Sequence, residues 1–205
     1  GISKSASTLV VVPTLLTSGD RSIEIFKQLE VFYLANPEEN LYFALVGDFK
    51  DGDKKEEAED REIINTGINM VEKLNKKYGR EIFYYFHRER KFCHKQNKWL
   101  GWERKRGALV ELNELLLGST KTSYTTISGD INEATTIKYV LTIDADTKLP
   151  LDTAKKLIGI AAHPLNKPII DAQKGIVVEG YGLVQPRIGV SMESSRRSLF
   201  TSCFT

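Results

Sequence analysis

The chain has 205 residues, 41% of them hydrophobic, which is enough for the core of one α/β domain of the larger kind. Its 29 basic and 27 acidic residues leave a net charge of +2, and this near balance argues against general nucleic-acid binding. The two cysteines, Cys93 and Cys203, match no metal-ligand spacing and predict a reduced, cytosolic domain without disulfides.

The chain is predicted to be one domain, residues 1–205, cut from a larger protein. Its last residues show neither a helix stop nor a polar tail, which indicates the cut. No apolar run approaches the roughly 18 residues of a membrane span, so we expect this fragment to be soluble. Membrane segments elsewhere in the parent protein stay compatible with the sequence.

Strands and helices alternate along the first part of the chain. The predicted strands span 9–16, 41–49 and 82–86, and the predicted helices span 21–34, 62–78 and 102–117. The run from Leu9 to Val12 is continuously apolar, as in a central parallel strand, and Pro13 is expected to end its pairing because proline cannot donate to a ladder. Apolar residues recur at helical spacing in each helix, and Gly79 is the expected stop of the second.

The second part of the chain continues the alternation. Residues 121–136 are rich in Ser and Thr and predict a loop or short hairpin. Residues 139–143 predict a strand buried on both faces, followed by a helix over 152–162 and a linker over 163–166. Residues 175–188 read as one strand interrupted by Gly180 and Gly182, or as two short ones. The whole order predicts an α/β fold, with a mostly parallel sheet and helices on both faces.

Carboxylates stand at the ends of two predicted strands. Asp144 and Asp146 follow the strand over 139–143, and Asp48 ends the strand over 41–49. Ligands bind at the carboxyl ends of strands in open α/β sheets. Carboxylate oxygens suit a divalent cation, Mg²⁺ or Mn²⁺, that also holds a diphosphate. The alternative for Asp144 and Asp146 is a helix N-cap beside an ordinary solvated acid.

Three consecutive cations, Arg104, Lys105 and Arg106, stand at the start of the helix over 102–117. Cations at this end oppose the helix dipole, which costs a little stability unless an anion lies nearby. A helix N-terminus with basic side chains is a suitable diphosphate site. A solvated basic turn is the alternative interpretation.

Two further polar groups of residues are less informative. Gln185 and Arg187 follow the glycine-rich strand, whose glycines permit close approach of a ligand or form a bulge. The histidines, His87, His94 and His163, have no zinc-site spacing and predict structural or solvated roles.

Seven segments together resemble the glycosyltransferase domain of cyclic β-1,2-glucan synthases (glycosyltransferase family 84), a GT-A, Rossmann-like fold related to cellulose-synthase-like transferases. The segments are VVVPTLLTS, QLEVFYLANPE, ALVGDFKD, GWERKRGALVELNELL, YVLTIDADTKLP, HPLNKP and VVEGYGLVQPR. They span about Leu9 to Arg187, and GWERKRG and the VVEGYG–QPR pair are much more specific than an Asp-x-Asp motif.

The resemblance implies an inverting hexosyltransferase that transfers glucose from a UDP-glucose donor to a growing β-1,2-glucan acceptor. It implies a divalent cation, and a large parent protein with membrane helices whose transferase domain lies on the cytoplasmic face of the inner membrane. Pro13 and Thr14 would lie beside the nucleotide, and Asp48 would accept a hydrogen bond from uracil. Asp144 would contact ribose or metal and Asp146 would bind the metal, while the three basic residues stabilise the leaving UDP. No residue is assigned as the catalytic base.

Three other functions match parts of the pattern. An aspartate-nucleophile phosphatase also places Asp-x-Asp after a buried strand, but here Lys148 stands two residues beyond Asp146, where such enzymes have Thr or Val. A dinucleotide-binding dehydrogenase lacks its Gly-x-Gly-x-x-Gly motif after the first strand. A non-catalytic or incomplete module that binds sugar nucleotides is the third, because the fragment holds the donor half of a site without an identifiable acceptor half.

Overall fold

The structure is a computed structural model that describes residues 1–134 and 136–186. The chain forms two compact units, Gly1–Gly159 and Ile160–Thr205. The strands of the first unit are β1 (Thr8–Leu16), β2 (Leu41–Phe49), β3 (Phe83–Arg88), β4 (Lys91–Cys93), β5 (Lys98–Leu100), β6 (Tyr124–Ser128) and β7 (Tyr139–Thr142). Its helices are η1 (Lys4–Ala6), α1 (Gly19–Ala35), α2 (Asp60–Tyr78), α3 (Arg104–Leu116) and α4 (Ile131–Ala134). Helix α5 (Thr153–Ala161) joins the units, and the second contains η2 (Pro164–Asn166), β8 (Ile169–Asp171) and β9 (Ile176–Glu179).

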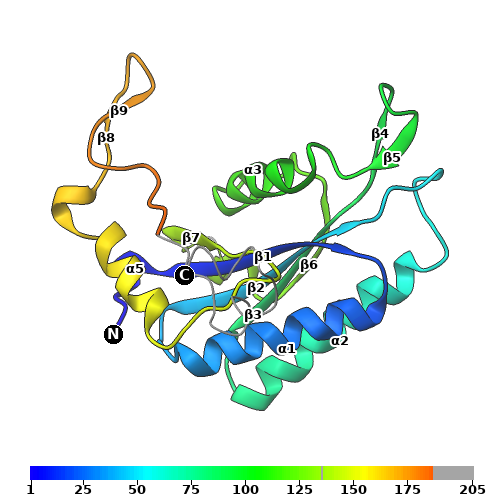
Figure 1. The fold of residues 1–205 in the computed structure, drawn as a ribbon, viewed down its shortest axis with the longest axis horizontal. Helices are drawn as coiled ribbons and strands as arrows, with labels where there is room; N and C mark the ends of the chain where they lie inside the picture. Colours follow the sequence, from blue (N-terminus) through cyan, green and yellow to red (C-terminus); the bar gives the residue numbers. More distant parts are fainter. Residues whose placement is uncertain (135, 187–205) are drawn as a thin grey trace, which may run out of the picture. The chain divides into compact units, whose positions relative to one another are not determined.

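The first unit is built on a five-stranded sheet with strand order β6-β3-β2-β1-β7. Strands β1, β2, β3 and β7 run parallel, and β6 is antiparallel to β3. Helices α1 and α2 cover one face of the sheet and α3 lies on the other (Figure 1). The predicted fold class is therefore confirmed, and this architecture is consistent with a Rossmann-like GT-A fold.

The core has two layers because successive strand residues point to opposite faces of the sheet. On the α3 side, one buried cluster contains Leu9, Val11, Tyr42, Ala44, Val46, Tyr84, Phe86, Ala108, Leu112, Leu116, Tyr124 and Ala134. On the other side, Phe26 of α1 meets Tyr85 edge-to-face, with ring centroids 6.1 Å apart. This burial on both faces explains the continuous apolar runs of β1 and β2.

The prediction that Pro13 ends the pairing of the first strand is wrong for its pairing with β2, which continues to Leu16. Pro13 lies within β1, opposite Val46 of β2 in the parallel register. The N–H of Ile143 donates to the carbonyl of Val11 on the β7 side (2.9 Å), and backbone groups alternate sides along a strand, so Pro13 faces the β7 side too. The pairing with β7 ends where Thr142 stands opposite Val11. The missing N–H of Pro13 therefore removes no hydrogen bond from the β1–β2 ladder.

Two predictions about the edges of the sheet are also wrong. Strand β7 was expected to be buried on both faces, but it is an edge strand, half-buried over its first three residues and exposed at Thr142. Residues 121–136 contain β6, an edge strand, in place of a loop or hairpin of their own. Buried and more exposed residues alternate in β6, so one face packs on the core while the β-branched Thr125 and Ile127 occupy the other.

The second unit contains an antiparallel hairpin of β8 and β9. Strand β9 stops before Gly180, whose φ of 72° lies in the left-handed region. A Cβ at Gly180 would lie 2.0 Å from the carbonyl oxygen of Lys167, so this glycine admits a neighbouring backbone of its own chain. The sequence analysis missed β8, which is only three residues long.

Candidate functional site

The carboxyl ends of the parallel strands bring several predicted residues to one edge of the sheet. Thr14 and Asp48 stand near the ends of β1 and β2, and Asp144 follows β7. Pro13 and Thr14 are half-buried, and the buried Oγ1 of Thr14 has no hydrogen-bond partner among the described residues. This edge is where open α/β sheets bind ligands.

Asp48 is engaged by a buried arginine that the sequence analysis missed. Nε and Nη2 of Arg88 donate to the two carboxylate oxygens of Asp48 at 2.7 and 2.6 Å. Arg88 is 1% exposed and Asp48 8%. Burial by itself lowers the pKa of Arg88, but the hydrogen bonds to Asp48 and Glu111 outweigh burial and raise it, so the guanidinium stays charged. The available signal was the polar cluster His87–Arg90 at the end of an apolar strand.

The same guanidinium reaches the start of α3. Its Nη1 donates to the carbonyl of Trp102 at 3.0 Å and to Glu111 Oε2 at 3.1 Å, and its Nη2 donates to the carbonyl of Arg104 at 3.0 Å. Burial raises the pKa of Glu111, but hydrogen bonds from Ser123 and Arg88 outweigh it and lower that pKa, so Glu111 is ionised beside Arg88. Strand β3 and helix α3 are thus joined by a buried charged network.

The three predicted basic residues each meet a carboxylate. Both oxygens of Asp51 accept from Arg104, with Nη2 at 2.7 Å from Oδ2. Arg106 pairs with Glu103 at 3.2 Å, one turn away on the same chain segment. Lys105 Nζ donates to Asp144 Oδ1, which links α3 to the turn after β7. The structure therefore brings Lys105 together with the Asp-x-Asp segment, whereas Arg104 and Arg106 have other partners.

Asp144 and Asp146 are both exposed and lie in a tight turn closed by a hydrogen bond from the Thr147 N–H to the Asp144 carbonyl (2.9 Å). Asp146 Oδ1 accepts a long contact, 3.4 Å, from Thr147 Oγ1. In residues 1–134 and 136–186, no group of three His, Cys, Asp or Glu residues gathers closely enough to hold a metal. Two exposed carboxylates fit a Mg²⁺ or Mn²⁺ ion whose other ligands are phosphate oxygens and water.

Three further residues singled out in the sequence are Gln185, Arg187 and His87. Gln185 is exposed in the second unit, and Arg187 lies outside the described residues. His87 is fully buried, and its Nδ1 lies 2.9 Å from the carbonyl of Arg88. Because a carbonyl only accepts, Nδ1 carries the proton and Nε2 is left without a partner among the described residues. Burial lowers the pKa of His87 to about 3, so the ring is neutral near pH 7.

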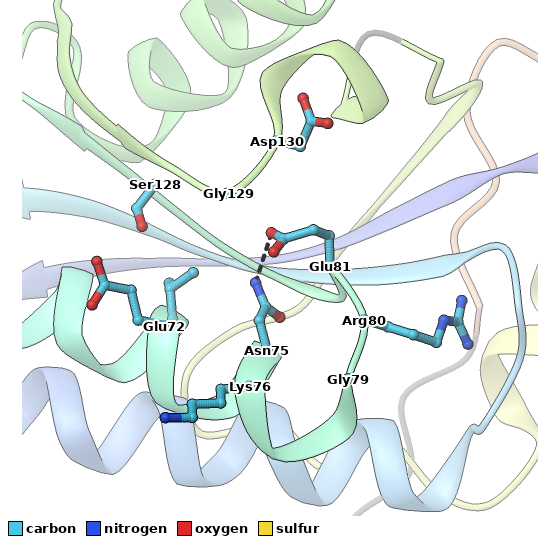
Figure 2. Close-up of a pocket in the computed structure, with 10 residues that line it drawn as sticks. Glu72, Asn75, Lys76, Gly79, Arg80, Glu81, Ser128, Gly129 and Asp130 are labelled. Carbon is cyan, nitrogen blue, oxygen red and sulfur yellow. Dashed lines mark hydrogen bonds between the residues drawn. The ribbon is translucent and has the colours of Figure 1, made fainter.

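A surface hollow of about 740 Å³ lies elsewhere, between the end of α2 and the end of β6 (Figure 2). Its lining includes none of the predicted site residues. Within it, Asn75 donates to Glu81 Oε2 and to the Phe83 carbonyl, both at 3.0 Å. Asn75 Oδ1 also accepts from two backbone N–H groups at the start of β3, so this polar side chain stabilises the turn between α2 and β3.

Comparison with known proteins tests the resemblance. No family model matches the chain. Over 209 aligned residues, the chain is 39% identical to the cyclic beta-(1,2)-glucan synthase NdvB of Rhizobium meliloti (strain 1021). This chain is related to a cyclic glucan synthase. The match covers the whole chain but only 7% of that protein, and the assignment to glycosyltransferase family 84 stays a prediction.

The parent protein's membrane segments also stay a prediction. Across the part of the chain that the structure describes, no helix combines the length and apolar character needed to cross a bilayer.

Proposed function

We propose that this chain is the donor-binding part of an inverting glycosyltransferase that transfers glucose from UDP-glucose to a growing β-1,2-glucan. The similarity to a glucan synthase along the entire chain carries the proposal. The sheet edge supports it, because Arg88 pairs with Asp48 of β2 and donates to the carbonyl of Arg104 at the start of α3, and Lys105 of α3 pairs with Asp144 of the Asp-x-Asp turn. The acceptor glucan, and other domains and membrane helices of a larger protein on the cytoplasmic side of the inner membrane, are the proposed partners.

Asp48 would select uracil. Arg88 occupies one lone pair on each carboxylate oxygen, and each oxygen keeps another that can accept the base N–H. Adenine presents a different pattern of donors at its edge, so an acceptor held in a fixed plane favours the uracil nucleotide. Thr14 lies on the neighbouring strand, and its hydroxyl has no hydrogen-bond partner in the part of the chain that the structure describes, so it would lie beside the same nucleotide.

Lys105 and the Asp-x-Asp turn would act on the diphosphate. Asp144 and Asp146 would hold Mg²⁺ or Mn²⁺, which when bound neutralises charge on the departing UDP. Lys105 now pairs with Asp144, and it becomes free for a phosphate oxygen once that carboxylate has another partner. Arg104 and Arg106 are exposed enough to turn toward the same anion. A β-linked product from an α-linked donor requires a single displacement and a general base, which this chain does not identify.

A second candidate is a sugar-nucleotide-binding module that does not turn over by itself. The observation that favours it is the 7% coverage of the related synthase, because the acceptor half of a site then belongs to other parts of such a protein. Turnover by the 205-residue chain, compared with a longer chain, separates the two candidates.

The test of the proposed site is calorimetric titration of UDP and UDP-glucose with and without Mn²⁺, using ADP and GDP as controls. We expect UDP binding that requires the metal, and a loss of about tenfold or more in Asp146→Asn, because one charged ligand is removed. The matched control is Asp130→Asn, an exposed acid of the separate hollow, which should bind as the wild type does. Unchanged metal-dependent binding in Asp146→Asn, or equal affinity for ADP, would contradict the proposed roles.

A further inference from the structure

We propose that Arg88 is a positioning residue that holds the Asp48 carboxylate and the first turn of α3 in one fixed arrangement. The inference rests on the proposed donor function and deepens it. In this arrangement, Arg88 sets the distance between the Asp48 carboxylate, proposed to bind the base, and the Lys105 ammonium, proposed to bind the diphosphate.

Arg88 uses all of its hydrogen-bonding capacity for this purpose. A guanidinium has five N–H donors in a rigid plane. Two go to Asp48, two go to the carbonyls of Trp102 and Arg104, and one goes to Glu111. Two segments that are distant in sequence, β2 and the first part of α3 with its preceding turn, are therefore oriented by one planar group that is 1% exposed. A lysine, with three donors on a flexible stem, cannot reproduce this pattern.

The turn before α3 has an unusual backbone conformation, which the hydrogen bonds from Arg88 stabilise. Glu103 and Arg104 both have φ of 52°, a left-handed conformation that residues other than glycine rarely adopt. The two carbonyls that accept from Arg88 belong to Trp102 and Arg104, so they bracket the unusual conformation. Glu103, at the N-cap position of α3, makes no side-chain capping hydrogen bond. Side-chain contacts from the sheet therefore replace an ordinary cap.

The geometry of the turn determines the direction of the Lys105 side chain, which follows it. Lys105 follows directly and reaches Asp144 after β7. A Cβ on Gly107 would lie 2.0 Å from the Trp102 carbonyl oxygen, and one on Gly101 would lie 2.8 Å from Asp48 Oδ2, so the turn is closely packed against its surroundings. A shift of the turn therefore moves Lys105. Loss of the Arg88 hydrogen bonds would leave both the Asp48 carboxylate and the turn less restrained.

Arg90 offers a matched control. Arg90 stands two residues after Arg88, just beyond the end of β3, and is 2% exposed. Its guanidinium donates to both carboxylate oxygens of Asp60, with Nη2 at 2.9 Å from Oδ1. Its other hydrogen bonds go to the carbonyls of Lys50 and Lys55, and the structure gives it no hydrogen bond to α3. Arg90→Lys thus breaks a comparable buried pair, at a place where we expect no effect on the turn.

The experiment combines hydrogen exchange with UDP titration on the 205-residue chain. The probes are the amides of Arg104 and Gly107, which donate to the carbonyls of Gly101 and Glu103 within the turn. In Arg88→Lys we expect both amides to exchange at least about tenfold faster and UDP to bind about tenfold to a hundredfold more weakly, as for lost charged hydrogen bonds. Arg90→Lys should leave both readouts within about threefold of the wild type.

Asp48→Asn provides a second variant if Arg88→Lys does not fold. Asp48 packs against Gly101, and within the described residues its carboxylate accepts hydrogen bonds from Arg88 and not from the turn. Asn has nearly the same size and shape as Asp, so if Asp48 only read the base, Asp48→Asn would leave the exchange of the turn's amides unchanged. If Asp48 orients Arg88, as proposed, the amides of Arg104 and Gly107 exchange faster in Asp48→Asn even without nucleotide.

The outcomes separate the two proposals. Faster exchange in Arg88→Lys and Asp48→Asn, together with no UDP binding by the wild type, would support the positioning role of Arg88 and contradict the donor function. Unchanged exchange in both variants would overturn the role of Arg88, whatever the wild type binds. Equal loss of UDP affinity in Arg88→Lys and Arg90→Lys would also overturn it, because the effect would then be one of general stability.

Discussion

Gly101→Ala directly tests how tightly the Asp48–Arg88 pair is packed. A Cβ at Gly101 would lie 2.8 Å from both Cγ and Oδ2 of Asp48 and 2.9 Å from Arg88 Nη2. Both neighbours are buried and bonded to each other, so neither withdraws without breaking a charged hydrogen bond. Overpacking costs about 1–3 kcal/mol, and loss of one such bond adds about 1.5–3 kcal/mol. We therefore expect a destabilisation of about 2.5–6 kcal/mol.

The measurement is thermal denaturation followed by circular dichroism. For a chain of this size, 1 kcal/mol shifts Tm by about 2–4 °C, so Gly101→Ala should melt about 5–24 °C below the wild type. The matched control is Gly159→Ala in α5, where no atom of the described residues lies within 4 Å of the added Cβ and where the change should stabilise by about 0.4–1 kcal/mol. A Tm for Gly101→Ala within about 1 °C of the wild type would refute this reasoning.

Two further predictions concern stability. His87 has a pKa lowered from 6.5 to about 3 by burial, so below pH 6.5 the unfolded chain binds a proton that the folded chain does not. The free energy of unfolding then falls as pH falls from 6.5 toward 3, by up to about 1.4 kcal/mol per pH unit. Urea denaturation at pH 7 and pH 5 should show a smaller loss of stability in His87→Met than in the wild type. An equal loss in the two proteins would exclude His87 as its source. Leu112→Ala removes a side chain with 0% exposure from the core under α3 and should cost about 2–5 kcal/mol in the same assay. Leu117→Ala, at a site with 89% exposure, should change stability by less than about 0.5 kcal/mol, and equal effects of the two would contradict the assigned core.

The prediction of the fold succeeded where the signal is local. Strand β2 has the predicted bounds, Leu41–Phe49, and helix α2 ends before Gly79, which adopts the left-handed conformation expected of a helix stop. Both signals come from residues within a few positions of each other. The errors lie where a neighbouring strand decides the outcome. Pro13 remains in β1 because β7 has already ended beside it, and β6 forms because β3 offers it an edge.

The prediction of the site shows the same division. Asp48, Asp144 and the basic residues of α3 stand out because each follows an apolar strand or opens a helix. Arg88 was overlooked because an arginine after an apolar strand is most often solvated, and only the packing of α3 over the strand buries it. The polar hollow beside Asn75 left no mark in the sequence, since its lining comes from two separate segments.

The sequence by itself determined the alternation of the main strands and helices, the residues at the strand ends and the similarity to a glucan synthase. These follow from patterns among near neighbours and from motifs that are contiguous along the chain. Only the tertiary structure decided which charges meet: Arg88 with Asp48, 40 residues apart, and Lys105 with Asp144, 39 residues apart. The reason is that such contacts depend on strand order, register and the seating of α3 on the sheet, and many long-range interactions contribute to each of these.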